Sequence, residues 1–153
     1  MKTFRNFVNG QYVDAADGRT TPVVNPATSK QYGTAPLSSA ADIDAAMGAA
    51  AAAFEEWRDS TPSERSLALF RIADAVEARA EELIATEVEN TGKPVHLTRS
   101  EEIPPMVDQI RFFATAARHL EGKSAGEYMR NMTSMIRREP VGVCAQEIGR
   151  AHV

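Results

Sequence analysis

The sequence predicts a mixed α/β chain that contains a short β-hairpin, about three helices and then one or two strands. Three observations support this prediction. An Asn-Gly pair near the N-terminus lies between β-prone residues, which is typical of a hairpin. Apolar residues recur every three or four positions through the middle of the chain, as on a helix, and after Gly126 the period changes to two, as on a strand.

The hairpin is expected over residues 7–13, where Asn9 and Gly10 tolerate the positive φ angles of a type I′ turn. A short extended segment is expected over residues 22–26, which begin and end with proline. Both features place β-structure before the first helix.

Capping residues and apolar periodicity define three helices, over residues 40–58, 61–90 and 100–120. Each predicted helix carries an apolar stripe that must find a partner surface. The capping signals are Ser39 with Asp42 before the first helix, Thr61 with Glu64 at the start of the second, and Gly92 after its end.

Two strands are expected after the helices. Residues 133–138 alternate with a period of two, and residues 141–145 form a short apolar run that predicts the start of a buried strand. A buried strand of this kind normally leads into a crossover helix and a larger sheet. The sequence therefore predicts that the chain is a truncated part of a longer protein.

The composition favours a soluble protein of the cytoplasm. The net charge is −4, and acidic and basic residues are interleaved, which argues against a basic face for nucleic acid. A single cysteine excludes an intrachain disulfide. The N-terminus lacks the apolar core of a signal peptide, and the longest apolar stretch, residues 49–54, is too short to span a membrane.

No sequence motif for binding a phosphate, a dinucleotide or a metal ion occurs. The thiol of Cys144 could act as a nucleophile, but the favoured interpretation is a small buried residue in a strand, because no histidine or helix N-terminus is expected beside it. His96 is interpreted as an exposed loop residue and His119 as a residue that complements the dipole at a helix end.

An acidic group, Glu101, Glu102 and Asp108, lies at the start of the third predicted helix. Carboxylates interact favourably with a helix N-terminus, and this is the favoured interpretation. The alternative is recognition of a cationic substrate, in which a carboxylate pairs with an ammonium group.

Four motifs are spread along nearly the whole chain: Phe-Val-Asn-Gly-Gln-Tyr-Val (7–13), Val-Asn-Pro-Ala-Thr (24–28), Thr-Gly-Lys-Pro (91–94) and Arg-Arg-Glu-Pro-Val-Gly-Val (137–143). In this order they resemble the opening of the aldehyde dehydrogenase superfamily, which has an α/β fold. Finer features, such as residues 102–104 and 111–114, resemble bacterial 4-aminobutyraldehyde dehydrogenases. For such an ammonium-bearing substrate, the resemblance implies a role for Glu102 at the mouth of the substrate tunnel.

The resemblance implies oxidation of a small-molecule aldehyde to a carboxylic acid with NAD or NADP. In the family a cysteine thiolate adds to the aldehyde, an asparagine amide and a backbone N–H hold the oxyanion, hydride passes to the cofactor, and a glutamate activates water. The family has all of these residues downstream of the segment present here. No catalytic and no cofactor-binding residue is therefore expected in this chain, Cys144 is not the family nucleophile, and the chain alone is expected to be inactive.

The resemblance also implies contacts within the longer parent protein. The helices would pack on the cofactor-binding domain, and residues 133–139 would belong to an arm through which the parent forms a homo-oligomer. A monovalent cation would lie near Val24 and Asn90. Many relatives carry aspartate where this chain has Asn90, and a neutral amide is a weaker cation ligand than a carboxylate.

Three segments follow from this interpretation. Residues 1–132 form the hairpin and the helical part of the cofactor-binding domain, and residues 133–146 form the arm strand and the first strand of that domain. Residues 147–153 are expected to be a non-native tail, because Glu-Ile-Gly-Arg-Ala-His-Val matches the translation of a common sequencing adapter up to its stop codon. The alternative is a genuine short relative that has no catalytic role and joins full-length subunits through the strand at 133–139.

Overall fold

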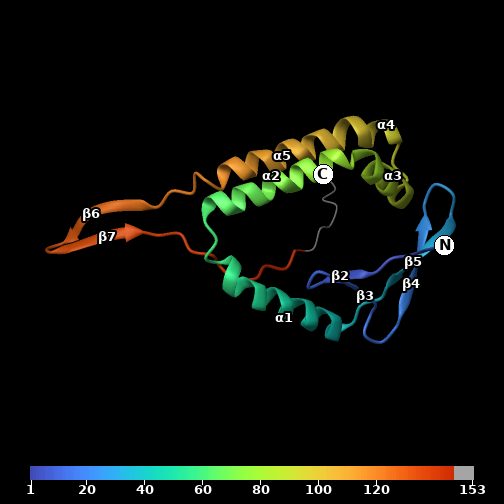
Figure 1. The fold of residues 1–153 in the computed structure, drawn as a ribbon, viewed down its shortest axis with the longest axis horizontal. Helices are drawn as coiled ribbons and strands as arrows, with labels where there is room; N and C mark the ends of the chain where they lie inside the picture. Colours follow the sequence, from blue (N-terminus) through green and yellow to red (C-terminus); the bar gives the residue numbers. More distant parts are fainter. Residues whose placement is uncertain (147–153) are drawn as a thin grey trace.

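The computed structural model describes residues 1–146, and the predicted non-native tail at 147–153 lies outside the described residues. Figure 1 shows β-structure near the N-terminus, a helical middle, and a later hairpin that projects away from the helices. This order confirms the predicted mixed α/β chain. No helix in the described part is long and apolar enough to cross a membrane.

The predicted N-terminal hairpin is present. Strand β2 (Asn6–Val8) pairs antiparallel with β3 (Gln11–Val13). The two turn residues, Asn9 and Gly10, have φ angles of 49° and 76°. Asparagine tolerates this left-handed region better than most residues, and glycine adopts it without steric cost, so the Asn-Gly pair specifies the turn.

A second sheet was only partly predicted. It has the order β1 (Lys2–Thr3), β5 (Lys30–Pro36) and β4 (Thr20–Asn25), with β1 parallel and β4 antiparallel to β5. The expected extended segment lies within β4, where Pro22 is tolerated because β4 is an edge strand. Strand β5 has no strong apolar alternation, so its pairing partners define it rather than its own sequence.

The first predicted helix is α1 (Ala40–Trp57). Its capping box is confirmed, because the carboxylate of Asp42 accepts hydrogen bonds from the backbone N–H and the hydroxyl of Ser39, at 2.7 and 2.9 Å. The apolar stripe of α1 is largely exposed: Ile43, Met47 and Trp57 all face solvent.

The second predicted helix is divided into α2 (Pro62–Ala78) and α3 (Ala80–Thr91). The chain bends at Arg79, whose φ and ψ angles of −109° and 21° are not helical. No glycine or proline marks this position, and the bend allows α3 to pack Ile84 into the core. Tertiary packing therefore overrides the local helix propensity.

The third predicted helix starts earlier and has a more complex beginning. It comprises α4 (Val95–Leu97), a π-helical turn η1 (Thr98–Glu102) and α5 (Ile103–Ala116). Two adjacent prolines, Pro104 and Pro105, lack N–H donors, and their rings would clash with the carbonyls four residues earlier in an α-helix. The wider π turn avoids this clash. The expectation of about three helices is thus corrected to five α-helices and one π turn in residues 1–146.

The core lies where α2 and α5 run side by side (Figure 1) and α3 closes one end. It is small, and much apolar surface on α1, α2 and α5 remains exposed. Its buried apolar cluster consists of Ala73, Ile84, Ile103 and Val107.

The strand predicted at 133–138 is confirmed as β7 (Met132–Ile136). It pairs antiparallel with β6 (Lys123–Met129), which was not predicted, and Asn131 has a positive φ of 64° in the turn between them. An isolated two-stranded hairpin is marginally stable in water. Within residues 1–146, the hairpin β6–β7 pairs with no other strand.

The second predicted strand, at 141–145, is wrong for the described chain. These residues form no strand, and Val141 is 91% exposed. A buried strand obtains its burial from neighbouring strands and covering helices. None of the strands in residues 1–146 pairs with this segment.

Candidate functional site

The candidate site lies where α3 ends and η1 begins. Gly92, with a φ of 73°, ends α3 in the left-handed conformation that was predicted for its cap. Pro94 is extended, and α4 then leads directly into η1. The turn brings the end of η1 back beside α3. Glu87 on α3 and Glu102 at the end of η1 therefore both lie next to Lys93.

Lys93 connects these two acidic residues. Its Nζ atom donates hydrogen bonds to Oε1 of Glu87 at 2.8 Å and to Oε1 of Glu102 at 2.6 Å. The bond to Glu102, followed by the bond to Glu87, raises the pKa of Lys93 above its ordinary value. Lys93 is therefore protonated throughout the physiological range, and Glu102 carries a permanent counter-ion.

The predicted acidic group does not converge on one place. Glu102 belongs to the Lys93 cluster, whereas Asp108 lines a separate pocket and Glu101 is exposed. Glu102 occupies the N-cap position of α5 but makes no side-chain capping hydrogen bond. An ion pair with Lys93, and not capping, is thus the interaction that the structure shows for the Glu102 carboxylate.

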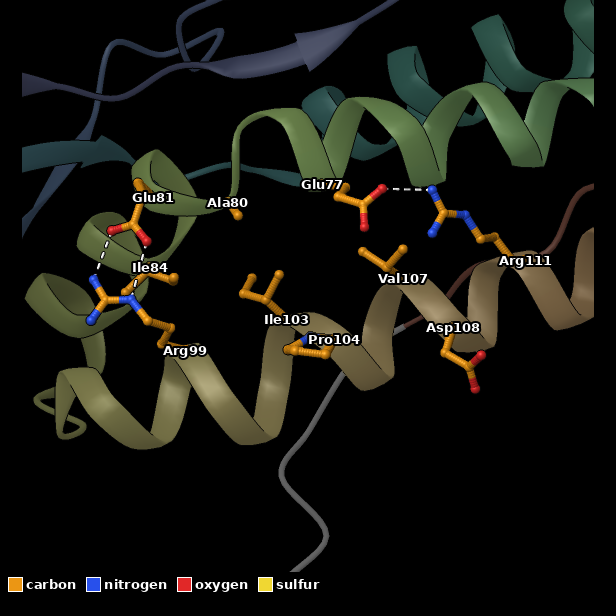
Figure 2. A pocket seen from close by; sticks show the side chains of 10 residues that line it. All are labelled: Glu77, Ala80, Glu81, Ile84, Arg99, Ile103, Pro104, Val107, Asp108 and Arg111. Atoms are coloured by element: carbon orange, nitrogen blue, oxygen red, sulfur yellow. Dashed lines mark hydrogen bonds and ion pairs between the residues drawn. The ribbon is translucent and has the colours of Figure 1, made fainter.

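The separate pocket has a volume of about 310 Å³ and lies between the α2–α3 bend and the start of α5 (Figure 2). Its floor is the apolar core, including Ile84, Ile103 and Val107. Two ion pairs cross its rim, Arg99 with Glu81 and Arg111 with Glu77, both at 2.7 Å. Through these ion pairs, Arg99 links η1 to α3 and Arg111 links α5 to α2.

The two residues expected near a monovalent cation lie on elements that pack together. Val24 is on β4, Asn90 is in the last turn of α3, and α3 contacts β4. Oδ1 of Asn90 accepts a hydrogen bond from the Tyr32 hydroxyl at 3.1 Å. In a neighbouring pocket, Glu89 is paired with Lys2. The amide oxygen of Asn90 is neutral, and a neutral oxygen is a weaker cation ligand than a carboxylate.

No group of three or more histidine, cysteine, aspartate or glutamate side chains in residues 1–146 is arranged to hold a metal ion. The described residues also do not fit a dinucleotide. Only β1 and β5 pair in parallel there, and no glycine-rich turn leads from β5 into α1. Dinucleotide binding needs such a turn at the edge of a parallel sheet, where a helix N-terminus meets the pyrophosphate.

The single thiol does not lie in the predicted environment. Cys144 is exposed, and its Sγ atom lies 3.9 Å from the carbonyl oxygen of Gly142. The expectation of a buried strand residue is therefore wrong, for the same reason as the strand itself. His96 is exposed as predicted, although it lies in α4 and not in a loop, and His119 follows the end of α5.

The Lys93 cluster was missed from the sequence. Lys93 was noted only as part of a motif, and its partners lie six residues before it and nine residues after it. Ion pairs within a helix join residues that are three or four positions apart, and neither spacing fits this rule. The chain leaves the helix at Gly92, so the contacts form across a turn. Only the turn geometry brings the three side chains together.

Comparison with known proteins gives a consistent result. The sequence pattern of the aldehyde dehydrogenase family matches residues 12–147. The chain is 38% identical over 143 residues to the NADP/NAD-dependent aldehyde dehydrogenase PuuC of Escherichia coli, covering 92% of this chain and 29% of that protein. It is 37% identical over 145 residues to a long-chain-aldehyde dehydrogenase of an Acinetobacter species, covering 95% of this chain and 29% of that protein.

The fold agrees with the sequence comparison. The structure superposes on the crystal structure of an NAD-dependent aldehyde dehydrogenase from Sinorhizobium meliloti with a TM-score of 0.82 and 34% identity, covering 88% of this chain and 27% of that one. The chain thus spans less than a third of the length of these relatives. Its pattern match, its sequence identity and its fold all show that the chain belongs to the aldehyde dehydrogenase family.

Proposed function

We propose that this chain acts as part of a longer NAD(P)-dependent aldehyde dehydrogenase, which oxidises an aldehyde to a carboxylic acid in the cytoplasm. The observation that carries the proposal is the family match over residues 12–147, together with coverage of only 29% of PuuC. In residues 1–146 only β1 and β5 pair in parallel, which supports our inference that the rest of the longer protein holds the cofactor and supplies the nucleophile.

The test is an assay of aldehyde-dependent cofactor reduction. We expect the longer protein to reduce NAD⁺ or NADP⁺ when an aldehyde is added, measured by the absorbance of the reduced nicotinamide. The purified 153-residue chain should give no turnover under the same conditions, because its described residues offer no site for the cofactor. Turnover by the short chain alone would refute the proposal.

We further propose that the substrate of the longer protein carries an ammonium group, as in 4-aminobutyraldehyde, and that Glu102 binds this group. The carboxylate of Glu102 is one-third exposed, and only its Oε1 atom is held by Lys93. Oε2 is thus available to a second cation. A carboxylate in this state attracts an ammonium more strongly than a neutral alkyl chain.

Substituting Glu102→Gln tests this role in the longer enzyme. We expect kcat/KM for 4-aminobutyraldehyde to fall about tenfold more than kcat/KM for butyraldehyde, since a hydrogen bond to a charged group contributes about 1.5–3 kcal/mol. Glu101→Gln is the matched control, because Glu101 is the exposed neighbour and does not contact Lys93. Equal losses for the two aldehydes in Glu102→Gln would contradict the role of Glu102.

Two further features of the longer protein belong to the proposal. A monovalent cation near Val24 and Asn90 is supported by the packing of α3 on β4 and by the amide oxygen of Asn90. A homo-oligomer formed through residues 133–139 is supported by the exposed hairpin β6–β7, whose strand edges are unpaired in the described chain.

The same hairpin favours the alternative function, a short non-catalytic relative that binds full-length subunits. Met132, Met135 and Ile136 are exposed on β7, so the strand offers both backbone hydrogen bonds and apolar side chains to a partner. This alternative predicts that the 153-residue chain associates with full-length subunits. The main proposal requires no such association by the chain alone.

A further inference from the structure

Lys93 is the most enclosed of the ion-pairing residues in residues 1–146. Its side chain is 20% exposed, the lowest value among all paired side chains there. It lies between Glu87, at 39%, and Glu102, at 33%. Attraction between charges increases as water is excluded, so we expect these two contacts to be stronger than the more exposed ion pairs on the same helices, such as Arg79 with Glu82.

The backbone around Lys93 fixes the position of its charge. Gly92 is in the left-handed region, and a Cβ atom at Gly92 would lie 3.0 Å from the ring of Pro26. The turn is therefore packed against the loop that follows β4. On the other side, Pro94 has its φ fixed by its ring and disfavours a helical backbone at Lys93, the residue before it. These restraints hold the backbone of Lys93 where its side chain reaches both Glu87 and Glu102.

The cluster contains two carboxylates and one ammonium, so its net charge is −1. Lys93 cannot neutralise both acids, and each acid keeps part of its negative charge uncompensated. The part that remains on Glu102 determines how strongly a second cation is attracted. Glu87 influences this quantity because it competes with Glu102 for the same lysine.

We propose that Lys93, by sharing its charge between Glu87 and Glu102, sets the preference of the substrate site for cationic over neutral aldehydes. This inference rests on the proposed role of Glu102 in binding an ammonium group. Lys93 acts as a resident competitor: it holds Oε1 of Glu102 and so reduces the negative charge that Glu102 offers to an incoming ammonium. Glu87 acts as a positioning residue, because it draws part of the lysine's charge away from Glu102.

The proposal predicts changes of opposite sign for two substitutions. The measured quantity is the ratio of kcat/KM for 4-aminobutyraldehyde to kcat/KM for butyraldehyde in the longer enzyme. Lys93→Met removes the competitor, and the ratio should rise roughly fivefold, the upper range for a partly exposed charge pair. Glu87→Gln leaves the whole lysine charge on Glu102, and the ratio should fall by about twofold to threefold.

Opposite signs separate this effect from damage to the fold. A folding defect reduces activity on both aldehydes and leaves their ratio constant, so a poorly folding Lys93→Met still leaves Glu87→Gln as a test. Lys30→Met is the matched control: it removes a lysine that forms no ion pair in the described residues, and its ratio should stay unchanged. In the double variant Lys93→Met/Glu102→Gln, the ratio should equal that of Glu102→Gln alone.

The outcomes distinguish the two proposals. A ratio that falls in Glu102→Gln but is unchanged in both Lys93→Met and Glu87→Gln overturns the role of Lys93 and leaves that of Glu102 intact. A ratio that is unchanged in Glu102→Gln overturns the role of Glu102, and the role of Lys93 with it. A rise in Lys93→Met that persists in the double variant also overturns the inference, because the effect would not act through Glu102.

Discussion

Replacing Ala73 by aspartate is expected to destabilise the fold by about 3–5 kcal/mol, the usual effect of burying a charge without a partner. Ala73 is 0% exposed and lies on α2 against Ile84, Ile103 and Val107. The short aspartate side chain cannot reach solvent from this position. Arg111, the one basic residue of α5, is already paired with Asp74 and Glu77.

The matched control is Ala75→Asp, two residues along the same helix. Ala75 is exposed, so this change should lower stability only by the helix propensity of aspartate, about 0.5–0.7 kcal/mol. Urea unfolding followed by the far-ultraviolet circular dichroism of the helices measures both variants. Similar midpoints for the two variants would show that α2 and α5 do not form the core described above.

The features that the sequence predicted correctly depend on nearest neighbours. The Asn9-Gly10 turn, the Ser39–Asp42 box and the left-handed Gly92 each require a particular residue type at one backbone position. Such requirements can be recognised without knowing what the element packs against. The general order of hairpin, helices and later strand follows from them.

The features that were missed depend on distant partners. Strand β5 exists because β1 and β4 lie on either side of it, and the bend at Arg79 exists because α3 must reach α5. The segment 141–145 shows the reverse case. Its sequence suits a buried strand, but it forms none because no strand among the described residues pairs with it. Local sequence specifies a tendency, and pairing or packing decides whether it is realised.

The same distinction applies to the candidate site. The acidic residue Glu102 was identified from a resemblance, and its charge alone suggested a cationic partner. The lysine that modifies this charge was not identified, because the turn after α3 and the π turn must both be known before Lys93 and Glu102 can be placed together. A site assembled across a turn of this kind becomes visible only in three dimensions.

The second sheet packs against α3 through β4, and within this sheet Gly33 leaves the least room for a larger side chain. Gly33 lies on the central strand β5, where a Cβ atom would be 2.7 Å from Cε2 of Phe4 and 2.9 Å from the backbone oxygen of Lys2. The aromatic ring can rotate, but the backbone oxygen belongs to β1, which is paired with β5 at this residue. An added methyl group must therefore push β1 away.

Gly33→Ala should accordingly destabilise the protein by about 2–3 kcal/mol, the upper range for overpacking a tight contact. The displaced strand carries Lys2, so its ion pair with Glu89 on α3 should be lost as well. Gly48→Ala is the matched control, because nothing lies within 4 Å of a Cβ atom there and Gly48 is inside α1. That change should stabilise the helix by up to about 1 kcal/mol. Thermal unfolding of the two variants should therefore shift in opposite directions, and a stabilised Gly33→Ala would mean that β1 does not pair with β5 in solution.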